Sequence, residues 1–231
     1  MLLAERYCRN ANAFSENELK IIQEKSICVI GCGGLGGNVI QSLARFGIGK
    51  LTLVDGDVFA TNNLNRQLFS NTTNLGRKKV EVTKEELFKV NPELDVQVVP
   101  EMLDLNNGTE IVANHHLVID CLDNIETRFL LADICTKLNI PLVHGAIGGF
   151  FGQVANLFPG DNMIERIYPD RKISDSGLEK LMGTPSFLPQ VIGGIQSSEA
   201  LKLLAGRQDV LQNSILFIDL LKNTMEEITM R

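Results

Sequence analysis

The sequence predicts an α/β fold: a Rossmann-like, mostly parallel sheet flanked by helices, with an antiparallel extension of the sheet at the carboxyl-terminal end. Two observations predict this fold. Between residues 26 and 158, short apolar runs alternate with segments of helical periodicity, as in a parallel sheet covered by helices. After residue 190, one helical segment precedes two short apolar runs that suit a hairpin.

Residues 26–57 predict a strand, a glycine loop, a helix and a second strand in succession. Apolar runs at Ser26–Ile30 and Leu51–Val54 enclose a segment with helical spacing. The loop matches G-x-G-x-x-G, in which backbone N–H groups and a helix N-terminus face a phosphate. Asp55, at the end of the second strand, is placed to bind a ribose hydroxyl. The glycines that we expect to bind the nucleotide are Gly31, Gly33, Gly34 and Gly36.

This glycine pattern has a purely structural alternative, in which the glycines only allow the strand and the helix to pack closely. The pattern by itself also does not choose between a dinucleotide and ATP. The choice depends on polar residues further along the chain.

The rest of the chain continues the alternation. Predicted helices cover about 78–90, 104–114, 125–138 and 192–204; predicted strands cover 95–99, 116–120, 141–144, 153–158, 214–220 and 224–230; and 145–152 is expected to be a glycine-rich turn. We expect a single domain with an amino-terminal helical arm (1–25), a nucleotide-binding core (26–158), a proline-containing crossover excursion (159–190) and a carboxyl-terminal helix and hairpin (191–231).

Composition indicates an ordinary globular protein. Of 231 residues, 44% are hydrophobic and 22% charged, and the net charge of −6 argues against nucleic acid or anionic membranes as partners. We expect no transmembrane helix and no signal peptide, and therefore a cytoplasmic location. The five cysteines form no C-x-x-C pair, so we expect reduced thiols and no thiolate zinc site. The histidines His115, His116 and His144 lack metal-ligand spacing and are interpreted as structural.

Two polar segments follow predicted parallel strands, which is where ligands bind in open α/β sheets. The first follows Asp55 and carries Arg66 and Lys79; the second follows the fourth strand and contains Asp120 and Asp123. The non-functional alternative is that Arg66 and Lys79 only lie in a solvated loop. For Asp123 it is a cap on the helix predicted for 125–138.

Ordered motifs along nearly the whole chain, about residues 5–230, resemble one family. They are RYCRN, GCGGLGG, LTLVDGDVF, NLNRQ, LGRKKVE, VIDCLDN, PLVHGA, GQV and GGIQSSEALKLLAG. The chain is similar to the ThiF/MoeB/HesA adenylyltransferases, which are related to ubiquitin-activating enzymes and activate ubiquitin-like sulfur-carrier proteins. Several motifs in the same order make a chance match very improbable.

The resemblance implies roles for individual residues. Gly34 and Asp55 match positions that hold adenosine and ribose, and Asp123 matches a magnesium-binding aspartate. Arg66 matches a triphosphate-binding arginine and Lys79 a phosphate-binding lysine. Asn63, Asn65 and Asn124 complete the expected nucleotide-binding set, and Arg9 matches an arginine that reaches across a dimer into the partner's site.

The resemblance also implies a reaction. ATP and Mg²⁺ would adenylate the C-terminal glycine of a small carrier that ends in Gly-Gly, releasing pyrophosphate, for cofactor or thiazole sulfur transfer. A homodimer is implied. No cysteine follows Cys135, so the adenylate is expected to pass to a separate sulfur donor. Two C-x-x-C pairs that bind zinc in many members are absent, so no zinc is expected.

Two other functions are open at this stage. The glycine pattern and Asp55 alone also suit a nicotinamide-dependent oxidoreductase, although that function leaves Arg66, Lys79 and Asp123 unexplained. A non-catalytic interaction subunit with the same fold is the other alternative. The late helix is similarly ambiguous, since Gly193, Gln196 and Glu199 match a helix that helps build the family's dimer but equally suit a core helix.

Overall fold

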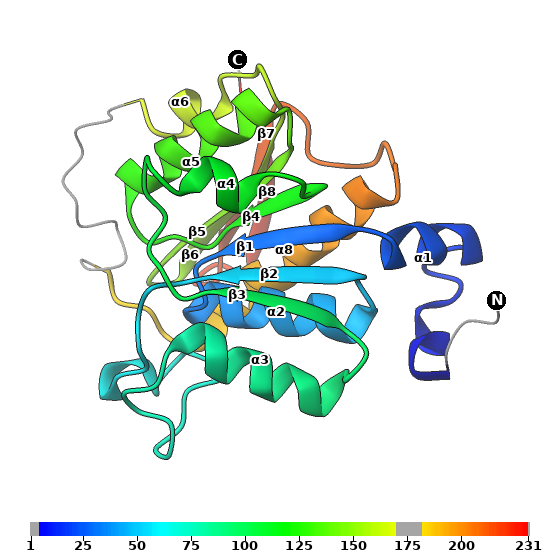
Figure 1. The fold of residues 1–231 in the computed structure, drawn as a ribbon. Coiled ribbons are helices and arrows are strands. Elements are labelled where there is room, and N and C mark those ends of the chain that lie inside the picture. The colour runs from blue at the N-terminus through cyan, green and yellow to red at the C-terminus, as the bar shows by residue number, and fades with distance from the viewer. Residues whose placement is uncertain (1–4, 170–181, 231) are drawn as a thin grey trace.

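The computed structural model describes residues 5–169 and 182–230. These residues form one eight-stranded sheet in the order β3-β2-β1-β4-β5-β6-β7-β8, with helices on both faces (Figure 1). The five strands from β3 to β5 pair in parallel, and β6, β7 and β8 extend the sheet through antiparallel pairs. The predicted fold class is therefore confirmed.

The strands are β1 (Ser26–Ile30), β2 (Lys50–Val54), β3 (Asp95–Val99), β4 (Leu117–Asp120), β5 (Leu142–Gly148), β6 (Phe151–Leu157), β7 (Ser214–Asp219) and β8 (Thr224–Thr229). The α-helices are α1 (Glu16–Gln23), α2 (Gly34–Phe46), α3 (Lys79–Val90), α4 (Gly108–Val112), α5 (Ile125–Leu138), α6 (Met163–Ile167) and α8 (Phe187–Leu204). Two 3-10 helices, η1 (Glu5–Asn10) and η2 (Thr61–Asn63), complete the described elements.

Strand β1 lies at the topological switch point of the sheet. It pairs in parallel with β2 on one side and with β4 on the other. The connection after β1 leads to α2 on one face of the sheet and the connection after β4 leads to α5 on the other, so a crevice forms between the carboxyl ends of β1 and β4. Ile30, the last residue of β1, pairs with both Val54 and Asp120, so the three strands end at the same level.

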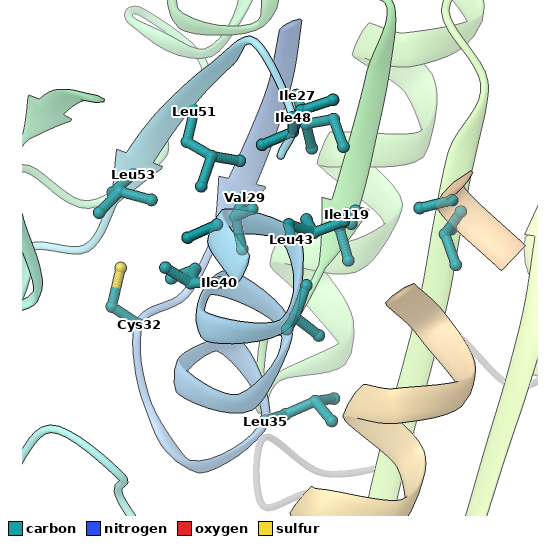
Figure 2. Packing of buried hydrophobic residues seen from close by; sticks show 14 of the residues in the cluster. Ile27, Val29, Cys32, Leu35, Ile40, Leu43, Ile48, Leu51, Leu53 and Ile119 are labelled. Carbon is teal, nitrogen blue, oxygen red and sulfur yellow. The ribbon is translucent and has the colours of Figure 1, made fainter. Parts of the chain in front are cut away.

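Two apolar clusters hold the helices against the sheet. One cluster joins α2, α3 and α8 to one face, and the other joins α4, α5 and α6 to the opposite face (Figure 1). In Figure 2, Ile40 and Leu43 of α2 pack against Val29 of β1 and Ile119 of β4. Burying one such side chain contributes about 1.5–3 kcal/mol. This packing fixes the start of α2 beside the carboxyl end of β1.

Some predicted boundaries were wrong. Strand β5 continues through Gly145 to Gly148, where the sequence indicated a turn. The glycine allows close approach, because a Cβ at residue 145 would lie 2.4 Å from Cδ of Gln196. Helix α8 begins at Phe187, and Pro189 lies in its first turn, where proline is tolerated. Helix α6 falls within the segment predicted to be an excursion, and the rest of that prediction, 170–181, lies outside the described residues.

Candidate functional site

A cavity of about 330 Å³ lies at the carboxyl ends of β1, β2 and β4. Its walls include the glycine loop, the residues after β2 and the loop between β4 and α5. Among the sequence-predicted site residues, those that line it are Gly31, Gly33, Gly34, Asp55, Arg66, Lys79, Asp123 and Asn124. Three segments that are distant in sequence thus bring two cations and two carboxylates to one cavity.

The glycines of the loop divide into two groups. Gly31 has φ +98°, and a Cβ there would lie 2.6 Å from the carbonyl oxygen of Cys121. A Cβ at Gly36 would lie 1.8 Å from the carbonyl oxygen of Gly31. This geometry favours a packing role for these two glycines, and their binding of a nucleotide stays a prediction. Gly33, by contrast, is the N-cap of α2 and provides no side-chain cap, so the first N–H groups of a thirteen-residue helix remain for an anion.

Asp55 is a buried carboxylate that organises the loops around it. Its Oδ2 accepts the backbone N–H of Cys32 at 2.8 Å, and its Oδ1 accepts the N–H of Asp57 at 2.8 Å. A carboxylate has about four acceptor positions, so two remain for another donor such as a ribose hydroxyl. The carboxylate thus links the end of β2 to the glycine loop that begins α2.

Lys79 is the first residue of α3, and its side chain is 7% exposed. Its Nζ lies 2.9 Å from Oδ2 of Asp57 and 3.9 Å from Oδ2 of Asp55. Sequence reasoning missed Asp57, which lines the cavity and is exposed. The buried ammonium group is therefore already neutralised by carboxylates, and a phosphate in the cavity would compete with Asp57 for it.

Arg66 is held by its own loop. Its Nη1 donates to the carbonyl oxygen of Asn62 at 2.8 Å and to Oδ1 of Asn65 at 2.9 Å. Asn63 supports the same turn, since its Oδ1 accepts the N–H of Ala60 at 2.9 Å. Asn63 and Asn65 do not line the cavity; the structure places them where they shape the loop that presents Arg66. Their direct binding to a nucleotide stays a prediction.

The Asn65 amide also reaches a distant part of the chain. Its Nδ2 donates to the carbonyl oxygen of Thr184 at 3.1 Å. Next to this contact, the N–H of Gly149 donates to the carbonyl oxygen of Gly183 at 2.8 Å. The segment that leads into α8 is thereby tied to the loop of Arg66.

Asp123 and Asn124 have separate roles at the start of α5. Asn124 is the N-cap, and its Oδ1 accepts the N–H of Thr127 at 2.8 Å. The alternative that Asp123 caps this helix is therefore wrong. Asp123 is exposed and lines the cavity, and within 5–169 and 182–230 its carboxylate has no hydrogen bond or ion pair.

This donor set fits magnesium only together with a polyphosphate. In the described parts of the chain, no group of three or more His, Cys, Asp or Glu side chains could hold a metal ion. Mg²⁺ typically takes one or two carboxylates, substrate phosphate oxygens and water. Asp123 supplies one such carboxylate at the cavity wall.

Arg9 is the predicted site residue farthest from this arrangement. It is exposed on η1, and its neighbour Asn10 donates from Nδ2 to the carbonyl oxygen of Phe46 at 2.8 Å. Phe46 ends α2, whereas the cavity lies at the start of that helix. A thirteen-residue helix is about 20 Å long at 1.5 Å per residue. Arg9 does not line the cavity of its own chain.

A buried polar cluster, which sequence reasoning also missed, lies behind the Asp123 loop. We call Asp120, Arg128, His144 and Tyr168 the Asp120 cluster. His144 Nδ1 lies 2.7 Å from Oδ2 of Asp120, and Tyr168 Oη lies 3.2 Å from Nε2 of His144. Burial lowers the pKa of His144 despite its bond to Asp120. Burial alone would raise the pKa of Asp120, but Arg128, His144 and the N–H of Leu122 together hold it below its ordinary value.

The late helix is part of the core of its own chain. Gln196 is buried and donates from Nε2 to the carbonyl oxygen of Asp120 at 2.9 Å. Glu199 accepts Nδ2 of Asn156 at 2.7 Å and the N–H of Leu211 at 2.9 Å. These contacts favour the core interpretation of both residues.

Cys121 lines the cavity, but burial raises the pKa of its thiol well above the ordinary value, so it is a neutral thiol.

The fold and the cavity together define a nucleotide-binding domain of the Rossmann-like α/β class. The ThiF family model matches residues 7–231, and the chain belongs to that family. The resemblance stated from the motifs is therefore confirmed. No helix within the described ranges is long and apolar enough to cross a bilayer.

Several curated relatives carry names that describe activities. The chain is 36% identical to the SAMP-activating enzyme E1 of Haloferax volcanii, over 89% of this chain and 76% of that protein. It is 33% identical to the sulfur carrier protein adenylyltransferase of Thermus thermophilus, over 91% and 80%. A probable molybdopterin-synthase adenylyltransferase of Porphyra purpurea is 31% identical, over 92% of this chain but only 58% of that protein.

Solved structures share the fold at low identity. The chain superimposes on E. coli MccB with ATP at a TM-score of 0.77, with 23% identity, covering 99% of this chain and 72% of MccB. It superimposes on PaaA at a TM-score of 0.76, with 20% identity, covering 93% and 66%. These likenesses support the Rossmann-like fold.

Proposed function

We propose that this protein is an adenylyltransferase that uses ATP and Mg²⁺ to activate the C-terminal glycine of a ubiquitin-like sulfur-carrier protein. The observation that carries the proposal is the meeting of Arg66, Lys79 and Asp123 at one cavity beside the uncapped start of α2. Relatives named as adenylyltransferases or as activating enzymes of such carriers support it. A separate donor then supplies sulfur for cofactor or thiazole synthesis.

The proposed reaction exchanges the phosphoanhydride between the α- and β-phosphates of ATP for a mixed anhydride between the carrier's carboxyl group and AMP. A carboxylate oxygen of the carrier attacks the α-phosphorus of ATP, the bond from that phosphorus to the bridging oxygen breaks, and pyrophosphate leaves with the bridging oxygen. The nucleophile is already an anion, so no general base is required. The principal barrier is the approach of an anion to a polyanion, and positive groups aimed at the phosphates lower it.

Arg66, Lys79 and the start of α2 supply that positive potential. Each charge-assisted hydrogen bond from the two side chains contributes about 1.5–3 kcal/mol. Lys79 would exchange Asp57 for a phosphate oxygen, so its charge stays compensated before and after binding. Magnesium, when bound, would supply Lewis-acid neutralisation of the leaving pyrophosphate, with Asp123 as its protein ligand.

ATP–pyrophosphate exchange tests the proposal. With a carrier ending in Gly-Gly, we expect exchange that requires both the carrier and magnesium. Arg66→Ala and Asp123→Ala should each reduce the exchange rate about 10²- to 10³-fold, because each removes a group that stabilises charge in the transition state. Matched controls are Arg45→Ala and Asp133→Ala, which alter exposed residues outside the cavity and should retain wild-type exchange.

The outcomes separate the three functions. Exchange at the wild-type rate in either cavity variant would refute the assigned role. NADH binding without exchange would support the oxidoreductase, and a folded protein that binds neither NADH nor ATP would support the interaction subunit.

We also propose a homodimer in which Arg9 acts in the partner's cavity. Its place about one α2 length from its own cavity supports delivery to a second copy rather than to its own site. Arg9→Ala and Asp123→Ala proteins, each inactive alone, should regain partial exchange when mixed, because a hybrid dimer contains one intact site. Absence of recovery, once subunit exchange has been demonstrated, would contradict the shared site.

A further inference from the structure

Leu122, the residue immediately before Asp123, has both of its backbone polar groups held by the Asp120 cluster. The backbone N–H of Leu122 donates to Oδ1 of Asp120 at 2.9 Å. The carbonyl oxygen of Leu122 accepts Nη2 of Arg128. One residue further, the Asp123 carboxylate lines the cavity. The orientation of that carboxylate therefore depends on a residue, Leu122, whose backbone N–H and C=O are both fixed by buried charges.

Arg128 is itself anchored in three directions. It is 4% exposed, its Nη1 donates to the hydroxyl of Tyr168, and its Nε lies 3.7 Å from Oδ2 of Asp120. Its guanidinium carbon also lies 5.8 Å from the centre of the Tyr168 ring. A planar guanidinium can make these contacts together, whereas a lysine ammonium is a single point charge.

This arrangement is costly for stability alone. Burying an ion pair removes two charges from water, and well-packed apolar residues of similar volume often stabilise a protein as well or better. The cluster lies between α5, β4 and α6, where apolar residues form the rest of the packing. The polar contacts of the cluster converge on the backbone N–H and C=O of Leu122, which points to a role in fixing the backbone at that residue.

We propose that Arg128 is a positioning residue that fixes the Leu122–Asp123 peptide and thereby presents the Asp123 carboxylate to magnesium and the departing pyrophosphate. This inference rests on the proposed function for the identity of the ligand, but not for the fixing of the loop. Tyr168 takes part by holding Nη1, so it links the Asp123 loop to the end of α6.

Amide hydrogen exchange in the nucleotide-free protein tests the fixing directly. Arg128→Lys keeps a cation but loses the planar guanidinium with its several N–H donors, and Tyr168→Phe removes only a hydroxyl. We expect exchange at the amide of Leu122, which donates to Asp120, to rise at least tenfold in Arg128→Lys and by a smaller factor in Tyr168→Phe, with exchange in β1 unchanged. The matched control is Lys137→Met, an exposed cation on the same helix. Unchanged exchange at the Leu122 amide in both variants would overturn the inference.

The magnesium dependence of ATP binding provides a second measurement, and a purely structural role of Arg128 would leave it unchanged. ATP binding is measured by calorimetry without carrier across a magnesium titration. We expect the half-saturating magnesium concentration to rise about 10- to 100-fold in Arg128→Lys, as for residues that orient metal ligands. ATP affinity without magnesium should not change. An unchanged magnesium requirement in a folded Arg128→Lys protein would contradict the positioning role.

The two proposals fail in different ways. If the wild-type protein shows no carrier-dependent exchange, the proposed function fails, and the hydrogen-exchange result still decides the role of Arg128. If the wild-type exchange is normal but neither variant changes amide exchange or magnesium dependence, the positioning role fails alone.

Discussion

The parallel and antiparallel parts of the sheet differ in burial and in what lies at their ends. Every residue of β1 and β4 is buried, and helices cover both faces of that region (Figure 1). Every residue of β8 is exposed, although β8 pairs with β7 along its whole length. The cavity lies at the carboxyl ends of the parallel strands, and Arg66, Lys79 and Asp123 line it there.

The difference follows from strand direction. Parallel strands that end together bring the loops after them to one edge, so residues far apart in sequence converge there. Arg66, Lys79 and Asp123 come from the segments after β2 and β4. In the antiparallel part, successive strands end at opposite edges, so the segments that follow them are divided between the two edges. Three sets of variants test this contrast.

The largest effect is expected at the glycine loop of the parallel part. Gly36→Ala would place a Cβ 1.8 Å from the carbonyl oxygen of Gly31, so the loop and α2 must separate. We expect a loss of more than about 4 kcal/mol in unfolding free energy, with loss of ATP binding. The control is Gly194→Ala in α8, where a Cβ meets open space and should be tolerated. Denaturant unfolding measures both, and a stable Gly36→Ala protein would contradict the packing argument.

A smaller effect compares strand β2 with strand β8. Leu53 is fully buried, so Leu53→Ala should cost about 2–5 kcal/mol of unfolding free energy through lost packing and a cavity. Ile228 is 46% exposed, and Ile228→Ala should lie within about 0.5 kcal/mol of wild type. Urea unfolding measures both variants. Equal losses of unfolding free energy at the two positions would contradict the contrast and show that Ile228 is covered in solution.

The smallest effect concerns an ion pair that joins the two parts. Arg207, in the connection from α8 to β7, lies with Nε 2.6 Å from Oε1 of Glu18 in α1. This hydrogen bond, together with smaller contributions from the backbone and side-chain hydrogen bonds of Ser15, lowers the pKa of Glu18 from 4.5 to about 2. Because the folded-state pKa is depressed, the contribution to stability is present above pH 4.5 and is lost as pH falls toward 2. The difference in Tm between wild type and Glu18→Gln should shrink over that window; a difference independent of pH would contradict it.

Much of the parallel part could be predicted from the sequence because its signals are local. The apolar runs, the glycine loop and the helical spacing between 26 and 57 each report on neighbouring residues. The glycines of β5 misled the prediction, because Gly145 gives room to the Gln196 side chain rather than making a turn. Contacts between residues fifty positions apart leave no local pattern.

The candidate site was predictable to the same degree. The resemblance selected Arg66, Lys79 and Asp123, and the structure brings them to one cavity, while the roles assigned to them stay predictions. The pairing of Lys79 with Asp57 was not predictable, because an aspartate two residues after Asp55 has no spacing signal of its own. The Asp120 cluster was missed for the same reason, since His144 and Arg128 meet only through the pairing of β4 with β5 and the packing of α5.

The contacts of Tyr168 and Thr184 have a consequence for signalling between surface and cavity. In sequence these two residues stand on either side of 170–181; one holds Arg128 behind the Asp123 loop, and the other holds Asn65 beside Arg66. A docked protein that displaced both flanks would therefore disturb the loops of Arg66 and Asp123, the proposed ligands of phosphate and magnesium, at the same time. Under the proposed function, docking of the carrier protein and rearrangement of the ATP-binding residues would then occur together.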